Sequence, residues 1–174
     1  MIRKATLNDI EAISDLYDIA IDYEDSHVKY TSWQKGIYPT ADTARFGVKC
    51  DSLYVFEDGG KILASVILDT SQPPEYRNVS WSVKSGVHGA LVIHTLCVHP
   101  ECVGLGIGSK IVDFAKELAS ELNCSTIRLN TTSTNTLAYH FYEKNGFAIV
   151  AKQKMLLNGQ IPCKEHLFME FVIK

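Results

Sequence analysis

The run from Ile93 to Lys110, IHTLCVHPECVGLGIGSK, constrains the fold more than any other part of this chain. An apolar strand leads into a turn that contains Gly104, Gly106 and Gly108, and apolar residues at helical spacing follow directly. A turn of this kind leaves backbone N–H groups unpaired at a helix N-terminus, where the helix dipole also favours negative charge. The pattern therefore predicts an α/β chain with a backbone cradle for a phosphate group.

The spacing of the glycines distinguishes this turn from two common phosphate-binding motifs. The Walker A loop ends in Gly-Lys-Ser/Thr, whereas this turn ends in the reversed order Gly108-Ser109-Lys110. The dinucleotide fingerprint is G-x-G-x-x-G, whereas the spacing here is G-x-G-x-G. Neither motif fits, and a glycine-rich strand–helix turn also occurs as a tight connection without a ligand. The glycine turn alone therefore does not distinguish a phosphate-binding site from a simple strand–helix connection, and further motifs in the chain are needed.

A second pattern follows the predicted helix. A short β-rich run, Thr126 to Asn130, leads into a polar turn and then into NTLAYHFYEKNGF, from Asn135 to Phe147. The stretch from about Ile93 to Phe147 resembles the core of the GNAT superfamily of acyl-CoA-dependent N-acetyltransferases. In that family a (Gln/Arg)-x-x-Gly-x-(Gly/Ala) turn grips the coenzyme A pyrophosphate, and an Asn-x-x-Ala-x-x-(Phe/Leu)-Tyr helix places a tyrosine beside the thioester sulfur. Val103 stands where the family usually has Gln or Arg, so we expect weakened affinity rather than lost function.

The resemblance implies a set of binding residues for acetyl-CoA, the acetyl donor. The strand around Leu96 to Val98 would hydrogen-bond the pantetheine arm and supply a backbone N–H to the thioester carbonyl. The glycine turn would bind the pyrophosphate through its main chain. The implied cofactor-binding residues are Leu96, Cys97, Val98, Val103, Gly104, Leu105, Gly106, Ile107, Gly108, Ser109, Asn130, Asn135 and Tyr142.

Two residues are candidates for proton transfer. Tyr142 is the candidate general acid, because a phenol with a pKa of about 10 stays protonated at neutral pH and can reprotonate the leaving thiolate. His94, two residues before Leu96, is the candidate general base, because histidine is the residue type most often used for proton transfer near neutral pH. The alternative for His94 is a satisfied histidine in or beside the core. Cys97 has no His–carboxylate partner at a readable spacing, so a covalent cysteine mechanism is not indicated.

Two irregular segments, Asp25 to Pro39 and Asp69 to Gly89, are expected to build the pocket for the amine acceptor. The first is rich in aromatic residues, and the second holds Tyr76 and Trp81. Aromatic faces suit a cationic amine or an aromatic ring. Filling space beneath long loops is the alternative role for the same side chains. The candidate substrate-binding residues are Trp33, Tyr38, Tyr76 and Trp81.

Length and composition fit a single domain over residues 1–174, with 46% hydrophobic and 21% charged residues. A net charge of −3 without a basic cluster argues against a nucleic-acid partner. No apolar stretch approaches the ~20 residues that span a bilayer, and the N-terminus lacks a signal-peptide core, so we expect a cytoplasmic protein with no membrane partner. The five cysteines include no C-x-x-C pair, which indicates free thiols and no metal site.

Local signals place the remaining elements. The expected fold is α/β (α+β), a GNAT-like mixed and mostly antiparallel central sheet flanked by helices in the order β-α-α-β-β-β-α-β-α-β-β. Thr6, with Asp9 three residues on, predicts the start of the first helix. The other expected elements are a strand over Ile2–Ala5, helices to about Tyr23 and over Thr40–Lys49, strands over Ser52–Phe56 and Lys61–Leu68 around a Glu57–Gly60 turn, and strands over Ala148–Leu156 and His166–Ile173 with a turn at Asn158-Gly159.

The sequence thus predicts an N-acetyltransferase that moves the acetyl group of acetyl-CoA to a primary amine of a small molecule or peptide, by direct transfer in a ternary complex. A non-catalytic acyl-CoA binding or sensing module is the first alternative. A nucleotide-binding protein with an unrelated α/β fold is the second. Because the last two strands commonly form dimers in relatives, a homodimer is left open.

Overall fold

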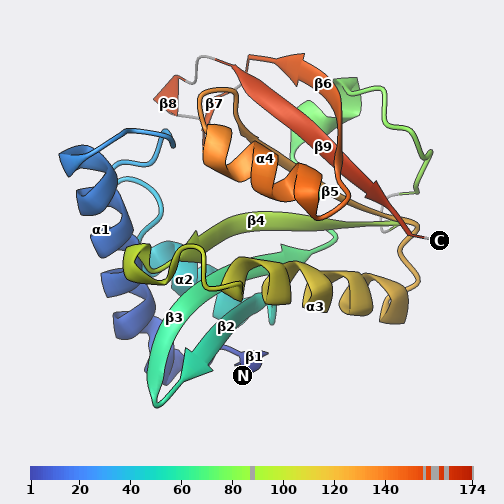
Figure 1. Ribbon diagram of the computed structural model, residues 1–174. Coiled ribbons are helices and arrows are strands. Elements are labelled where there is room, and N and C mark those ends of the chain that lie inside the picture. Colours follow the sequence, from blue (N-terminus) through green and yellow to red (C-terminus); the bar gives the residue numbers. More distant parts are fainter. Residues whose placement is uncertain (87–88, 155, 158–160, 163–164, 174) are drawn as a thin grey trace. The chain divides into compact units, whose positions relative to one another are not determined.

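The computed structural model describes residues 1–86, 89–154, 156–157, 161–162 and 165–173 (Figure 1). The described part of the chain divides into two compact units. The first unit comprises Met1–Lys29, Trp33–Leu68 and Ile93–Phe114, and the second comprises Tyr30–Ser32, Asp69–Val92 and Ala115–Lys174. Among the helices that the structure describes, none combines the length and apolar character needed to cross a lipid bilayer.

The first unit holds the N-terminal helices and strands. Its elements are β1 (Ile2–Lys4), η1 (Leu7–Asp9), α1 (Ile10–Ser26), α2 (Ala41–Lys49), β2 (Leu53–Asp58) and β3 (Lys61–Asp69, with its last residue in the second unit). Thr6 begins the helical segment as predicted, since its backbone N–H donates to Asp9 Oδ2 at 2.7 Å. The short 3-10 helix η1 then continues into α1.

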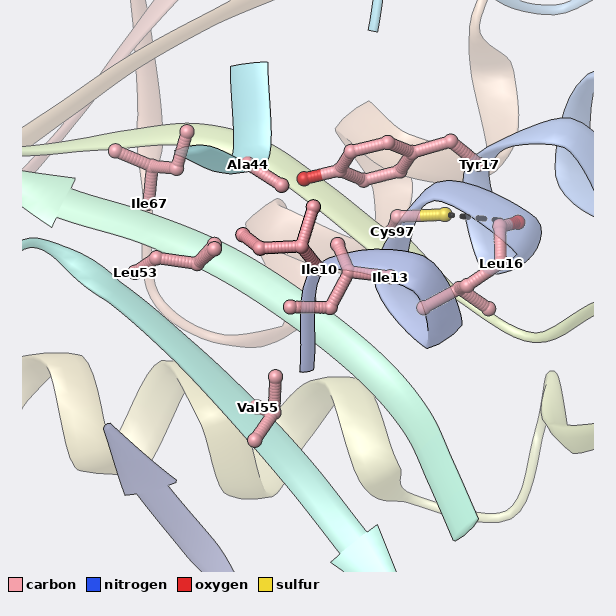
Figure 2. Close-up of a cluster of buried hydrophobic side chains, with 9 residues drawn as sticks. All are labelled: Ile10, Ile13, Leu16, Tyr17, Ala44, Leu53, Val55, Ile67 and Cys97. Carbon is pink, nitrogen blue, oxygen red and sulfur yellow. Dashed lines mark hydrogen bonds between the residues drawn. The ribbon is translucent and has the colours of Figure 1, made fainter. Parts of the chain in front are cut away.

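The core of the first unit forms where the apolar face of α1 meets β2 and β3. Figure 2 shows this cluster, in which Ile13 and Tyr17 of α1 are fully buried. Ala44 of α2 closes it, and Leu53 and Val55 contribute from β2. The helical spacing of the apolar residues in α1 thus produces a buried stripe, as the sequence predicts.

Two elements run from one unit into the other. Strand β4 (Ala90–Val98) begins in the second unit and ends in the first, and α3 (Ile107–Glu121) begins in the first and ends in the second. The short 3-10 helix η3 (Pro100–Cys102) lies between them. Strand β4 begins at Ala90, directly after the irregular segment expected to end at Gly89, and Ala90, Leu91 and Val92 pair with β5.

The second unit contains the C-terminal strands. Its elements are η2 (Pro74–Asn78), β5 (Thr126–Thr132), α4 (Thr136–Lys144), β6 (Ala148–Gln153), β7 (Leu156–Leu157), β8 (Ile161–Pro162) and β9 (His166–Val172). Tyr76, Val79, Val92 and Phe168 form a buried cluster within this unit, and Trp81 packs against it.

The described strands form a seven-stranded sheet in the order β1-β2-β3-β4-β5-β9-β6 and a separate β7–β8 pair. The β4–β5 pair is parallel, whereas the β1–β2, β2–β3, β5–β9 and β6–β9 pairs are antiparallel. The prediction of a mixed, mostly antiparallel sheet flanked by helices is confirmed.

Two local differences separate the fold from the sequence expectation. The predicted strand over Ala148–Leu156 ends at Gln153, and β7 is a separate element. The loop from Asp69 to Gly89 contains the 3-10 helix η2. The predicted turn at Asn158-Gly159 lies outside the described residues.

Candidate active site

The glycine turn in the first unit has the geometry of a backbone anion cradle. Gly104 and Gly106 have φ angles of +86° and +79°, and a Cβ added at either would meet nothing within 4 Å. This left-handed conformation is the one that glycine adopts most readily. Open space beside both residues leaves room for a ligand at the main chain.

The first turn of α3, directly after Gly106, contains backbone N–H groups that are not hydrogen-bonded within the helix. The first hydrogen bond of the helix runs from Lys110 N to Gly106 O at 3.1 Å. Within the described part of the chain, the N–H groups of Ile107, Gly108 and Ser109 precede it and have no acceptor. Gly108 therefore belongs to the helix rather than to the turn. Several unpaired donors at the positive end of a 15-residue helix suit a phosphate or pyrophosphate group.

The cradle is flanked by two exposed apolar side chains. Val103 is 63% exposed and Leu105 is 67% exposed, although both are large and apolar. Because both side chains are exposed, packing in the core of the unit does not explain why these two positions carry apolar residues. Val103 directly precedes the left-handed Gly104, and Leu105 stands between Gly104 and Gly106.

The cysteine on strand β4 is buried and unreactive. Cys97 is 2% exposed, and its Sγ donates to Leu16 O at 3.9 Å inside the core (Figure 2). Burial raises the pKa of the Cys97 thiol to about 12. Because the thiolate is the nucleophilic form, this thiol is inert at neutral pH. His94, Leu96 and Val98 are partly buried on the same strand.

One conformational feature of β4 is not visible in the sequence. Thr95 has φ +48° in the middle of the strand. A β-branched residue with positive φ is a genuine outlier, so the backbone of β4 departs from extended geometry just before Leu96. No sequence signal marks this position, because threonine favours the extended conformation.

In the second unit, α4 carries the predicted tyrosine. The Asn135 side chain caps the helix by accepting a hydrogen bond from Ala138 N at 3.0 Å. Tyr142 is 7% exposed and lies edge-on to Phe141 and Phe147, with ring centroids 5.0 and 5.4 Å away. Burial raises the pKa of the Tyr142 phenol above its usual value. The hydroxyl is therefore protonated at neutral pH and available as a proton donor.

Asn130 belongs to a partly buried chain of hydrogen-bonded polar side chains that the sequence does not reveal. The Tyr76 hydroxyl donates to Asn130 Oδ1 at 2.9 Å, and Asn130 Nδ2 lies 2.7 Å from His166 Nδ1. Because Asn130 Oδ1 accepts from Tyr76, its amide nitrogen faces His166 and donates to it. The structure thus brings together two predicted site residues, Tyr76 and Asn130, with one residue that sequence reasoning missed.

His166 gives a pH-dependent prediction. Burial lowers the pKa of His166 from its ordinary value of 6.5 to about 4. Between those pH values the unfolded chain binds a proton that the folded chain does not, so stability is fully present above pH 6.5 and falls as the pH drops. We expect the free energy of unfolding to fall by about 1 kcal/mol per pH unit in this window through His166. Urea unfolding at pH 7 and 5 should show a smaller loss in His166→Gln; equal losses in both proteins would contradict the assignment.

The four candidate acceptor-pocket aromatics fall into separate units. Tyr76 and Trp81 lie in the second unit, with ring centroids 5.1 Å apart, and Trp81 Nε1 donates to Tyr76 O at 2.9 Å. Trp33 and Tyr38 lie in the first unit, where Trp33 packs against the core cluster of Figure 2. The Tyr38 hydroxyl shares a hydrogen bond of 2.5 Å with Thr95 Oγ1. Each pair therefore has packing or hydrogen-bonding partners within its own unit.

Sequence reasoning also missed a buried ion pair in the second unit. Arg128 of β5 and Glu170 of β9 are 4% and 1% exposed, and Arg128 Nε donates to Glu170 Oε1 at 3.2 Å. The Arg128 guanidinium also lies 4.4 Å from the Trp81 ring. Arg128 and Glu170 are directly paired in the antiparallel β5–β9 register. The available signal was a charged residue between apolar neighbours in each strand, Arg128 between Ile127 and Leu129 and Glu170 between Met169 and Phe171.

The sequence model of the Acetyltransferase (GNAT) family matches residues 13–147 of this chain. That span covers most of the 174 residues and includes the glycine turn and the Tyr142 helix. The chain belongs to the GNAT acetyltransferase family. Members of this family act on amine acceptors such as small molecules or proteins. No curated protein matches the sequence.

Solved structures resemble this acetyltransferase over its whole length. A GNAT-family acetyltransferase of Streptococcus agalactiae 2603 has a TM-score of 0.81 at 19% identity, covering 100% of this chain and 95% of that one. An N-acetyltransferase of Staphylococcus aureus Mu50 has a TM-score of 0.70 at 20% identity, with 100% and 98% coverage. The yncA protein of Salmonella typhimurium, crystallised with its cofactor acetyl-CoA, has a TM-score of 0.73 at 17% identity, with 100% and 94% coverage. At these identities the likeness demonstrates a common fold.

Proposed function

We propose that this acetyltransferase moves the acetyl group of acetyl-CoA to a primary amine of a small molecule or peptide, by direct transfer in a ternary complex. The observation that carries the proposal is the cradle of unpaired N–H groups at the start of α3, with the left-handed Gly104 and Gly106 before it. In this proposal residues 1–174 act as one acetyltransferase domain.

The donor-binding residues follow from that cradle. The main chain from Gly104 to Ser109 would hold the pyrophosphate, because its donors have open space in front of them and the helix dipole behind them. The backbone from Leu96 to Val98, with Asn130, would bind the pantetheine arm. A backbone N–H in that strand segment would donate to the oxygen of the thioester carbonyl, where negative charge develops during transfer. Acetyl-CoA supplies the activated acetyl group.

Tyr142 is the proposed general acid. Its buried phenol remains neutral at physiological pH, because desolvation disfavours the charged form. The same desolvation would disfavour the departing thiolate, so the phenol can donate its proton to the sulfur as the C–S bond breaks. His94, on the strand that would hold the carbonyl, is the proposed general base for the incoming ammonium group.

Direct transfer is supported by the state of Cys97, the cysteine on strand β4. A covalent acetyl-cysteine route would need a thiolate on β4, and the Cys97 thiol is buried in the core with a pKa of about 12. The proposal therefore has the amine attack the thioester itself. The amine must lose its proton first, because an ammonium group has no lone pair to donate.

The decisive test is Tyr142→Phe. We expect turnover to fall about 100-fold, because a general acid contributes a factor of this order, while the Kd for acetyl-CoA stays within about twofold. The measurement is release of free thiol from acetyl-CoA across a panel of amines, with binding followed by calorimetry. Tyr139→Phe is the matched control, since Tyr139 lies on the same helix and is partly exposed.

The outcomes of this test separate the alternatives. Unchanged turnover in Tyr142→Phe would remove Tyr142 from the mechanism. Tight coenzyme A binding without thiol release on any amine would favour the non-catalytic acyl-CoA sensor. Equal affinity for ADP and coenzyme A would favour a nucleotide-binding protein instead.

A further inference from the structure

The left-handed conformation of Thr95 needs a cause. Residues held in sparsely populated backbone regions persist when the surrounding structure determines them, and such residues gather at functional sites. Thr95 is neither glycine nor asparagine, and it lies inside a nine-residue strand. The residue therefore depends on contacts outside its own backbone to stay at φ +48°.

Tyr38 supplies such a contact. Its hydroxyl and Thr95 Oγ1 are 2.5 Å apart, which joins two side chains 57 residues apart in the sequence. Burial raises the pKa of the Tyr38 phenol, so the hydroxyl is neutral and the hydrogen bond is present at physiological pH. The bond fixes the Thr95 side chain and, through its stiff β-branched Cβ, the backbone of the strand.

The position of Tyr38 is fixed independently of β4. Gln34 and Tyr38 close a tight turn by two backbone hydrogen bonds, from Gln34 N to Tyr38 O at 2.9 Å and from Tyr38 N to Gln34 O at 3.0 Å. Gly36 within the turn has φ +75°. Trp33 anchors one end on the core cluster, and Lys35 Nζ pairs with Asp22 of α1 at 2.6 Å. The turn therefore holds the Tyr38 hydroxyl from outside the strand.

The strand beyond Thr95 is also tied down. The Cys97 side chain is buried in the core, and His99 N donates to Leu63 O of β3 at 2.8 Å. The segment Leu96–Val98 thus lies between two fixed points, one at Thr95 and one at His99. A small rotation at Thr95 would redirect the backbone N–H groups of this segment without detaching it.

We propose that Tyr38 is a positioning residue: it holds Thr95 in the left-handed conformation and thereby aims the backbone N–H groups of Leu96–Val98 at the acetyl carbonyl oxygen. This inference rests on the proposed function. We expect the Tyr38–Thr95 contact to affect the rate of catalysis, because N–H donors stabilise an oxyanion only when they are held at the correct distance and angle. Tyr38 then serves the acetyl donor through Thr95, and contact with the amine is not its main role.

The test is a double-mutant cycle. Tyr38→Phe removes the hydroxyl and keeps the ring, and we expect kcat to fall about tenfold, while the KM for the amine and the Kd for acetyl-CoA stay within about twofold. Thr95→Gly allows positive φ without support. In a Thr95→Gly background, Tyr38→Phe should therefore change kcat by less than about threefold. Tyr23→Phe, at an exposed tyrosine of α1, is the matched control and should leave kcat unchanged.

Two results would overturn the inference. An equal loss of kcat from Tyr38→Phe in both backgrounds would mean that the hydroxyl does not act through Thr95. A raised KM for the amine with unchanged kcat would mean that Tyr38 contacts the acceptor instead.

A measurement without turnover separates this inference from the proposed function. Amide chemical shifts of Leu96, Cys97 and Val98 should differ between the acetyl-CoA and coenzyme A complexes, because only acetyl-CoA carries the thioester carbonyl oxygen of the acetyl group. Tyr38→Phe should abolish that difference, whereas Tyr23→Phe should retain it. Persistence of the difference in Tyr38→Phe would refute the positioning role, even if no amine supports thiol release. Absence of thiol release from the wild-type protein would instead count against the proposed function.

Discussion

Gly106→Ala is expected to weaken the binding of acetyl-CoA about 100-fold. The substituted residue would have to adopt φ +79° with a Cβ, and that Cβ would point into the open space proposed for the pyrophosphate. Loss of one charge-assisted hydrogen bond from the main chain, worth about 1.5–3 kcal/mol, accounts for a loss of this size. Calorimetric titration of acetyl-CoA into the wild type and the variant measures it.

The β2–β3 hairpin provides a matched control for backbone strain. Gly60 has φ +76°, and a Cβ there would also meet nothing within 4 Å. Gly60→Ala should therefore destabilise the fold about as much as Gly106→Ala and leave the Kd for acetyl-CoA unchanged. Equal affinity of both variants for acetyl-CoA would show that the turn at Gly106 is a tight connection and no phosphate cradle.

Glu170→Gln is expected to destabilise the protein by about 3 kcal/mol, because it leaves the Arg128 guanidinium buried without a countercharge. Both side chains are at most 4% exposed. The same pair fixes the segment after β3. Arg128 Nη1 donates to Gln72 Oε1 at 2.7 Å, Arg128 Nη2 donates to Val83 O at 2.6 Å, and Ser82 N donates to Glu170 Oε2 at 2.7 Å. Thermal unfolding should show a Tm lower by roughly 10 °C.

An exposed pair in the same unit is the control for the chemical change itself. Glu165 and Lys152 lie 2.8 Å apart with side chains 38% and 54% exposed. Glu165→Gln should change the free energy of unfolding by no more than about 0.5 kcal/mol, because solvent screens exposed pairs. If both Glu→Gln variants lost the same stability, burial of the Arg128–Glu170 pair would have no energetic role.

Sequence signals were accurate wherever neighbouring residues determine the structure. The capping pair Thr6 and Asp9 begins the first helical segment where expected. The Gly59–Gly60 turn joins β2 and β3, with both glycines at positive φ. Asn135 caps α4 and so places Tyr142 near its end. Each of these depends on contacts within a few residues, and such contacts follow from residue type and spacing.

The sequence did not predict side-chain contacts between segments that are far apart in the chain. The Tyr38–Thr95 hydrogen bond joins residues 57 apart, and the Arg128–Glu170 pair joins residues 42 apart. The sequence placed Tyr38, Tyr76 and Trp81 in irregular segments and left open whether they bind an acceptor or fill space. The structure gives each of them hydrogen-bond or ring partners within its unit, and their contact with an acceptor remains a prediction.

The sequence by itself determined the order of the longer helices and strands, the glycine turn at a helix N-terminus, the position of Tyr142 and the family, since local spacing and the family motifs encode them. Only the tertiary structure decided that Cys97 is an inert core thiol, that Thr95 is left-handed and that Asn130 contacts Tyr76 and His166. The physical reason is that burial and side-chain hydrogen bonds depend on which strands become neighbours. Strand pairing is set by the whole fold, so one residue type can be a ligand contact in one fold and a packing residue in another.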